Sequence, residues 1–95
     1  MNNLGELYNQ IGDFDLAKEY CLRAVKTNSN YAEAYNNLGT AQQENEDLNA
    51  AIESYNKAKE INPDDPEAYN NIAIIYGESG DRDNAYKYGG RYYYL

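Results

Sequence analysis

The sequence repeats with a period of 34 residues, and this repeat constrains the fold more than any other feature. Residues 32–65, AEAYNNLGTAQQENEDLNAAIESYNKAKEINPDD, can be superposed on the residues that precede and follow them. The positions that recur are Leu4, Leu38 and Ile72; Gly5, Gly39 and Ala73; Asp13, Asp47 and Asp81; and Ala17, Ala51 and Ala85. Self-similarity at such a period is typical of stacked helical hairpins. We therefore expect one domain, 1–95, made of three units at 1–31, 32–65 and 66–95.

Each unit is predicted to contain a helix, a tight turn and a second helix. In the middle unit, apolar and small residues at i, i+3, i+4 and i+7 predict a helix over about 32–45. A break at Asp47 separates it from a second amphipathic helix over 48–61, which Pro63 ends because proline disfavours helix in the residue before it. The repeat places the other helices at about 1–11, 15–27 and 66–78, with a sixth beginning near 82–84. This sixth helix is expected to be weakened, since Gly89 and Gly90 each cost about 1 kcal/mol relative to alanine.

Small residues mark the places where the two helices of a unit should meet most closely. Gly5, Gly39 and Ala73 are expected at these contacts, because a larger side chain there would wedge the helices apart. Asp13 and Asp47 stand at turns, where a carboxylate can cap the next helix by accepting backbone N–H bonds.

The composition excludes several classes of function. The chain has 8 Lys plus Arg against 16 Asp plus Glu, a net charge of −8, which disfavours binding to nucleic acid. It has no histidine and a single cysteine, Cys21, so Ser-His and Cys-His pairs and histidine-containing zinc sites are excluded. We expect no catalysis, no cofactor and no metal. No apolar run is long enough to cross a bilayer and no secretory signal begins the chain, so a cytoplasmic location is expected.

The repeated pattern resembles the tetratricopeptide repeat, which has aromatic residues, Leu-Gly, alanines and a proline at set offsets. The middle unit matches it with Tyr35, Leu38, Gly39, Ala51, Tyr55, Ala58 and Pro63. The first unit departs from it at Met1, Cys21 and Ser29, and the third at Gly89 and Tyr92. The resemblance implies an all-α solenoid of three stacked helix-turn-helix repeats, with about six antiparallel helices in a right-handed superhelical array. It also implies that the first helices of the units line a concave groove that binds peptides.

The candidate groove consists of the polar side of each first helix, opposite the side that faces the second helix. Its predicted residues are Asn2, Asn3, Glu6 and Asn9 in the first unit; Glu33, Asn36, Asn37, Thr40, Gln43 and Glu44 in the second; and Glu67, Asn70, Asn71, Ile74 and Glu78 in the third. The basic residues lie in or around the second helices, so the groove is expected to be negative and to attract basic peptides. Ile74 adds an apolar spot where a partner side chain could anchor.

The recurring Asn-Asn pair has two interpretations, because asparagine is a poor helix former and something must offset its cost. As a ladder of amides, the pairs would hydrogen-bond to the main chain of a bound peptide. Alternatively, the amides bond to one another or to water between adjacent helices and merely descend from copying one unit. Relatives that bind an acidic chaperone C-terminus use a clamp of Lys and Arg on the first helices. The corresponding positions here are Asn2, Glu6, Asn37, Glu67 and Asn71, of which only Asn37 agrees, and this disfavours that ligand.

Two hypotheses for function follow. In the first, the chain is a non-catalytic protein-interaction module that binds a neutral or basic peptide in its acidic, asparagine-lined groove. In the second, it is a fragment or an engineered repeat without a ligand of its own, which self-associates through uncapped ends. The second rests on Met1 falling inside a repeat and on the GGRYYYL tail, and it makes the C-terminal unit the expected contact of a homo-oligomer.

Overall fold

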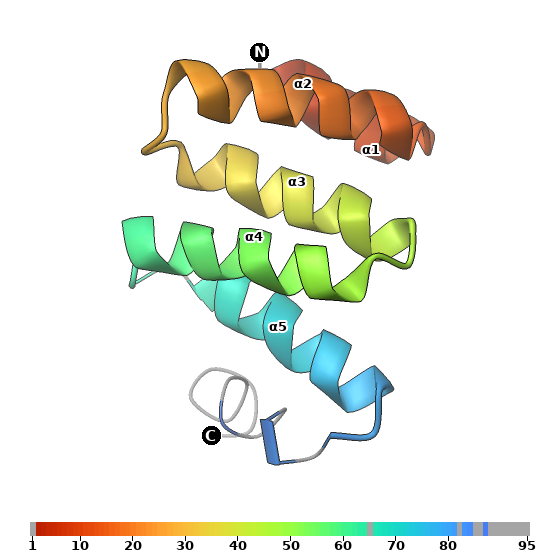
Figure 1. The fold of residues 1–95 in the computed structure, drawn as a ribbon, viewed down its shortest axis with the longest axis vertical. Coiled ribbons are helices and arrows are strands. Elements are labelled where there is room, and N and C mark those ends of the chain that lie inside the picture. Colours follow the sequence, from red (N-terminus) through yellow and green to blue (C-terminus); the bar gives the residue numbers. More distant parts are fainter. Residues whose placement is uncertain (1, 65, 82, 85–86, 88–95) are drawn as a thin grey trace.

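The computed structural model describes residues 2–64, 66–81, 83, 84 and 87, with side chains from residue 4 onward. Within these residues every regular element is a helix. The helices are α1 (Asn2–Ile11), α2 (Phe14–Thr27), α3 (Ala32–Glu44), α4 (Leu48–Ile61) and α5 (Pro66–Glu78). Consecutive helices run antiparallel and stack from the orange α1/α2 pair to the cyan and blue α5 (Figure 1). The predicted all-α solenoid is confirmed, and each helix lies within a residue or two of its predicted bounds.

The predicted sixth helix falls mostly outside the described residues, as do Gly89, Gly90 and the rest of the tail. Asp83, Asn84 and Lys87 are helical where the structure describes them. The Asn84 backbone N–H donates to Asp81 Oδ1 at 3.2 Å, so Asp81 caps this turn. The division into units 1–31, 32–65 and 66–95 stays a prediction.

The turns between paired helices share one hydrogen-bonding pattern, although their sequences differ. The backbone N–H groups of Asp13, Asp47 and Asp81 donate to the carbonyls of Tyr8, Gln42 and Tyr76 at 2.8–2.9 Å. This is the bond that closes a helix when the preceding residue adopts a left-handed conformation. That residue is Gly12 at φ 97°, Gly80 at φ 83° and, in the middle unit, Glu46 at φ 65°.

Only one of the two capping predictions holds. Asp13 Oδ1 accepts from the Leu16 backbone N–H at 3.3 Å, as expected. Asp47 occupies the equivalent position before α4, but its side chain makes no capping bond. The prediction was wrong there because the repeat preserves the position of the residue and leaves the rotamer of its exposed side chain open.

Helices pack through small residues, as the sequence indicates. Gly39 and Gly5 stand against the second helices of their units, where a built Cβ would lie 2.6 Å from Tyr55 Cε1 and 2.5 Å from Cys21 Sγ. Such distances are too short for any real side chain. The main apolar cluster combines Ala51, Tyr55, Ala58, Ala68, Ile72 and Ile75 from α4 and α5.

Candidate functional site

The first helices of the units, α1, α3 and α5, contact one another in this order. A hollow of about 440 Å³ opens where their N-terminal halves meet. It is lined by Glu6 of α1; Ala32, Glu33 and Asn37 of α3; Glu67 of α5; and Asn62, which ends α4. The structure therefore brings together four of the residues predicted for the groove, one or more from each unit. We call this the N-terminal hollow.

A second hollow, also of about 440 Å³, lies at the C-terminal ends of α3 and α5. Gln43, Glu44, Glu46, Leu48 and Glu78 line it. Every charged residue around the two hollows is a glutamate, and most of these side chains are exposed. Carboxylates concentrated on one face attract cationic groups. We call this the C-terminal hollow.

The acidic residues do not form a metal site within the part of the chain that the structure describes. No group of three or more Asp, Glu or Cys side chains there is close enough to hold a metal ion. The glutamates of the N-terminal hollow come from three helices, and those of the C-terminal hollow come from α3, the turn after it and α5, which suits an extended ligand with several contacts.

Polar side chains toward the C-terminal end of α3 are tied to the interior. Tyr55 of α4, 1% exposed, donates its hydroxyl proton to Gln43 Oε1 at 2.9 Å. The same hydroxyl lies 3.3 Å from Thr40 Oγ1, and Thr40 donates to the Asn36 carbonyl at 3.0 Å. Burial raises the pKa of Tyr55 to about 12, so its hydroxyl keeps its proton at neutral pH. Two of the predicted groove residues, Thr40 and Gln43, are therefore held in position by contacts with the buried Tyr55.

Asparagines in the predicted groove serve the packing between helices more than expected. The Asn9 side-chain amide donates to the Asn37 carbonyl at 3.0 Å, which joins α1 to α3. Asn9 is not a member of the recurring Asn-Asn pairs and its acceptor is a backbone carbonyl, so both interpretations of those pairs stay predictions. The side-chain oxygens of Asn9, Asn36 and Asn70 are buried and have no hydrogen-bond partner.

Asn36 corrects one expectation, because its side chain is only 2% exposed and is not available on an open groove. When the residues of one helix are projected along its axis, those on the side opposite the paired helix are all taken to be exposed to solvent. In the stack, α3 contacts α1, α2, α4 and α5, so part of its polar side is covered by neighbours. The accessible lining is therefore narrower than the sequence predicts.

The remaining predicted groove residues lie at varied depths. Glu44 and Ile74 are exposed, Ile74 by 40%, whereas Asn70 and Asn71 are half-buried. The side chains of Asn2 and Asn3 lie outside the described residues. Cys21 is fully buried beneath Gly5, and burial raises the pKa of its thiol to about 11, as fits a structural residue.

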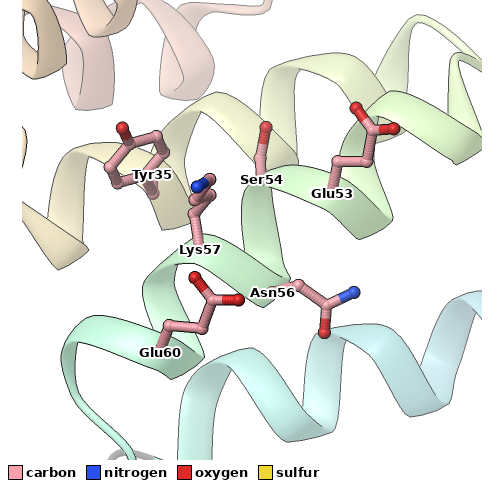
Figure 2. A pocket seen from close by; sticks show the side chains of 6 residues that line it. All are labelled: Tyr35, Glu53, Ser54, Asn56, Lys57 and Glu60. Atoms are coloured by element: carbon pink, nitrogen blue, oxygen red, sulfur yellow. The ribbon is translucent and has the colours of Figure 1, made fainter.

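A third hollow, which sequence reasoning missed, lies on the outer face of α4 (Figure 2). It measures about 380 Å³ and is lined by Tyr35 of α3 and by Glu53, Ser54, Asn56, Lys57 and Glu60 of α4. The i, i+3, i+4, i+7 spacing of four of these residues could have indicated a shared surface. Its charges have mixed sign, with Lys57 between two glutamates, so this outer hollow favours no ligand charge.

These helical hairpins, stacked through small residues, define an α-solenoid of repeats. Family models described as tetratricopeptide repeat match residues 1–31 and 20–53, and one described as TPR repeat matches residues 44–80. The chain belongs to the tetratricopeptide repeat family. In the part that the structure describes, no helix has the length and apolar character needed to span a membrane.

Solved structures of a protein named MamA are similar to this chain. One crystal structure of MamA is 33% identical with a TM-score of 0.90, over 95% of this chain and 53% of that chain. Another is 30% identical with a TM-score of 0.86, over 97% and 56% of the two chains. MamA 41-end from Desulfovibrio magneticus RS-1 is 23% identical with a TM-score of 0.87, over 92% and 49%, and shows the fold alone. The chain thus spans about half the length of these proteins, and a search of curated proteins found no match.

Proposed function

We propose that this chain is a non-catalytic protein-interaction module whose groove binds a neutral or basic peptide segment. Tetratricopeptide repeats generally mediate protein–protein interactions, which supports the class of function. The observation that carries the finer proposal is the N-terminal hollow, where Glu6, Glu33 and Glu67 converge from three helices beside Asn37. A peptide with lysine or arginine side chains would place cations near these carboxylates and its main chain near the amide.

The charge of both hollows supports the same choice of partner. A ligand that spans them would meet glutamates at each end and no lysine or arginine among the lining residues. Acidic peptides would be repelled, and the attraction of basic ones would weaken with salt because exposed charges are screened over about 8 Å at physiological ionic strength. A cytoplasmic location fits this role and stays a prediction.

The test removes negative charge from the groove without changing side-chain size. The probe is a fluorescein-labelled, end-blocked peptide of alternating lysine and alanine, measured by fluorescence anisotropy. Glu33→Gln combined with Glu67→Gln should weaken its binding by about tenfold at low salt, since each lost ion pair contributes up to about 1 kcal/mol. The matched control, Glu53→Gln with Glu60→Gln, removes the same charge from the outer hollow and should change the affinity less than twofold.

Either of two results would contradict the proposal. Equal losses in the two double variants would mean that net charge alone attracts the peptide. Stronger binding of a glutamate–alanine peptide than of the lysine–alanine peptide would mean that the groove selects the opposite charge.

Self-association is a second candidate function, and α1 provides the observation that favours it. Leu4, Leu7 and Ile11 are 37%, 46% and 65% exposed and lie along one side of this helix. At the positions equivalent to Leu4 and Leu7, the later units have Leu38 and Ala41 in α3 and Ile72 and Ile75 in α5, all buried. The same stripe is thus covered in two units and uncovered in the first, which leaves an apolar surface for another copy.

A further inference from the structure

Tyr55 connects the core of the middle unit to the groove surface. Its ring packs against Gly39 so closely that a built Cβ on Gly39 would lie 2.6–2.8 Å from three ring atoms. Because the ring is held between α3 and α4 backbones, the position of its hydroxyl is fixed as well. That hydroxyl lies 2.9 Å from Gln43 Oε1, at the wall of the C-terminal hollow.

The available protons determine how Gln43 is oriented. Thr40 uses its hydroxyl proton on the Asn36 carbonyl, and the single proton of Tyr55 goes to Gln43 Oε1, the nearer of its two contacts. The oxygen of the Gln43 amide is therefore occupied. A carboxamide has one oxygen and one NH2 group, so the NH2 group with its two donors is the part left for a ligand.

The surroundings of Gln43 define what such a ligand must offer. Glu44, Glu46 and Glu78 share the C-terminal hollow with it and call for a cationic group. An NH2 donor calls for an acceptor such as a carbonyl oxygen. A peptide residue with a basic side chain offers both groups within a few ångströms of each other.

The first unit lacks the pairing of Tyr55 with Gln43, so this pairing is specific to the middle unit and is not shared by all units of the repeat. Cys21 stands at the position of Tyr55, and Asn9 at the position of Gln43. A buried thiol cannot reach and orient an amide as a phenol does. Asn9 instead donates its own NH2 group to the Asn37 carbonyl, so its donors serve the contact between α1 and α3.

We infer that Tyr55 is a positioning residue for ligand binding: it holds Gln43 so that the C-terminal hollow presents an amide donor beside three carboxylates. The occupant of this hollow is then a basic peptide residue whose main-chain carbonyl accepts from Gln43. This inference rests on the proposed function, because it assigns one contact within the same groove.

The experiment compares two cationic probes that differ in their carbonyl groups. The lysine–alanine peptide has main-chain carbonyls, whereas spermine has ammonium charges and none. Tyr55→Phe should weaken binding of the peptide by about fivefold, the worth of one hydrogen bond, and leave spermine binding unchanged. Tyr35→Phe removes a tyrosine hydroxyl of α3 at the outer hollow and should affect neither probe.

A second variant separates positioning from a general effect on structure. In a Gln43→Met background, Tyr55→Phe should cause no further loss of peptide affinity, because Tyr55 acts through Gln43. Nitrogen-15 NMR of the free protein should show a shift of the Gln43 side-chain NH2 signals in Tyr55→Phe, with the backbone spectrum preserved elsewhere. Equal loss for both probes, additive losses in the double variant, or an unshifted Gln43 signal would overturn the inference. Failure of the peptide to bind the unchanged chain would instead overturn the proposed function.

Discussion

Glu46 occupies a backbone conformation that its neighbours in the repeat assign to glycine. Its φ is 65°, whereas the equivalent residues of the other turns are Gly12 and Gly80. A side chain in this left-handed region costs about 1–2 kcal/mol, because Cβ approaches the following carbonyl oxygen. Glu46 nevertheless completes the same turn, with its backbone N–H bonded to the Gln43 carbonyl at 3.0 Å. The middle unit, which otherwise matches the family pattern best, thus has the most strained turn.

Glu46→Gly should therefore stabilise the chain. We expect a gain of about 1 kcal/mol in the free energy of unfolding. Glycine relieves the strain of the left-handed conformation, and its greater entropy in the unfolded chain offsets part of that gain. Urea denaturation followed by circular dichroism measures it. The control is Glu53→Gly on the exposed face of α4, where helix propensity predicts a loss of about 1 kcal/mol. A loss of stability at both positions would contradict strain at Glu46.

At the scale of helices, the closest contact in the core joins α3 to α4 through Gly39 and Tyr55. A methyl group on Gly39 has no room beside the tyrosine ring, and the ring is buried on all sides. Gly39→Ala should lower the free energy of unfolding by about 2–3 kcal/mol, the upper range for overpacking, although alanine is the better helix former. A thermal melt followed by circular dichroism checks this.

Tyr55→Leu provides the control for this prediction, because it removes the atoms nearest to Gly39. Added to Tyr55→Leu, Gly39→Ala should cost less than about 1 kcal/mol, since contacting residues are not additive. A cost that stays equal in the two backgrounds would mean that the ring is not what restricts residue 39.

The elements could be predicted from the sequence because their signals are local and repeated three times. The i, i+3, i+4 pattern, the glycine turns and Pro63 set the helix bounds, and the small residues at 5 and 39 indicated the contacts. The site was predicted less completely. Burial of Asn36 depends on neighbouring helices, and the Tyr55–Gln43 bond depends on side-chain rotamers across two helices. Neither the burial of Asn36 nor the Tyr55–Gln43 bond can be predicted from the sequence pattern of a single helix.

At the scale of the whole molecule, an apolar stripe that one repeat exposes can associate with another copy. In this chain the stripe is formed by Leu4, Leu7 and Ile11 of α1. The equivalent positions of α3 and α5 are buried within the chain. The proposed groove and this stripe use different residues of α1, Glu6 for the first and Leu4, Leu7 and Ile11 for the second, so peptide binding and self-association can be separated by mutation.

Leu7→Glu tests self-association through this stripe. If the α1 stripe holds two copies together, the variant should sediment as a monomer at concentrations where the unchanged chain forms larger species. The helical content should stay unchanged, because Leu7 is 46% exposed and a glutamate there can keep its charge in solvent. Ile74→Glu, at an apolar residue of similar exposure on α5, should leave the oligomer intact.

Sedimentation velocity over a range of concentrations measures the mass of each variant. A single monomeric mass for the unchanged chain would exclude self-association. Dissociation by Ile74→Glu instead of Leu7→Glu would place the contact at the proposed groove. Peptide binding by the Leu7→Glu monomer would then show that the groove works without a second copy.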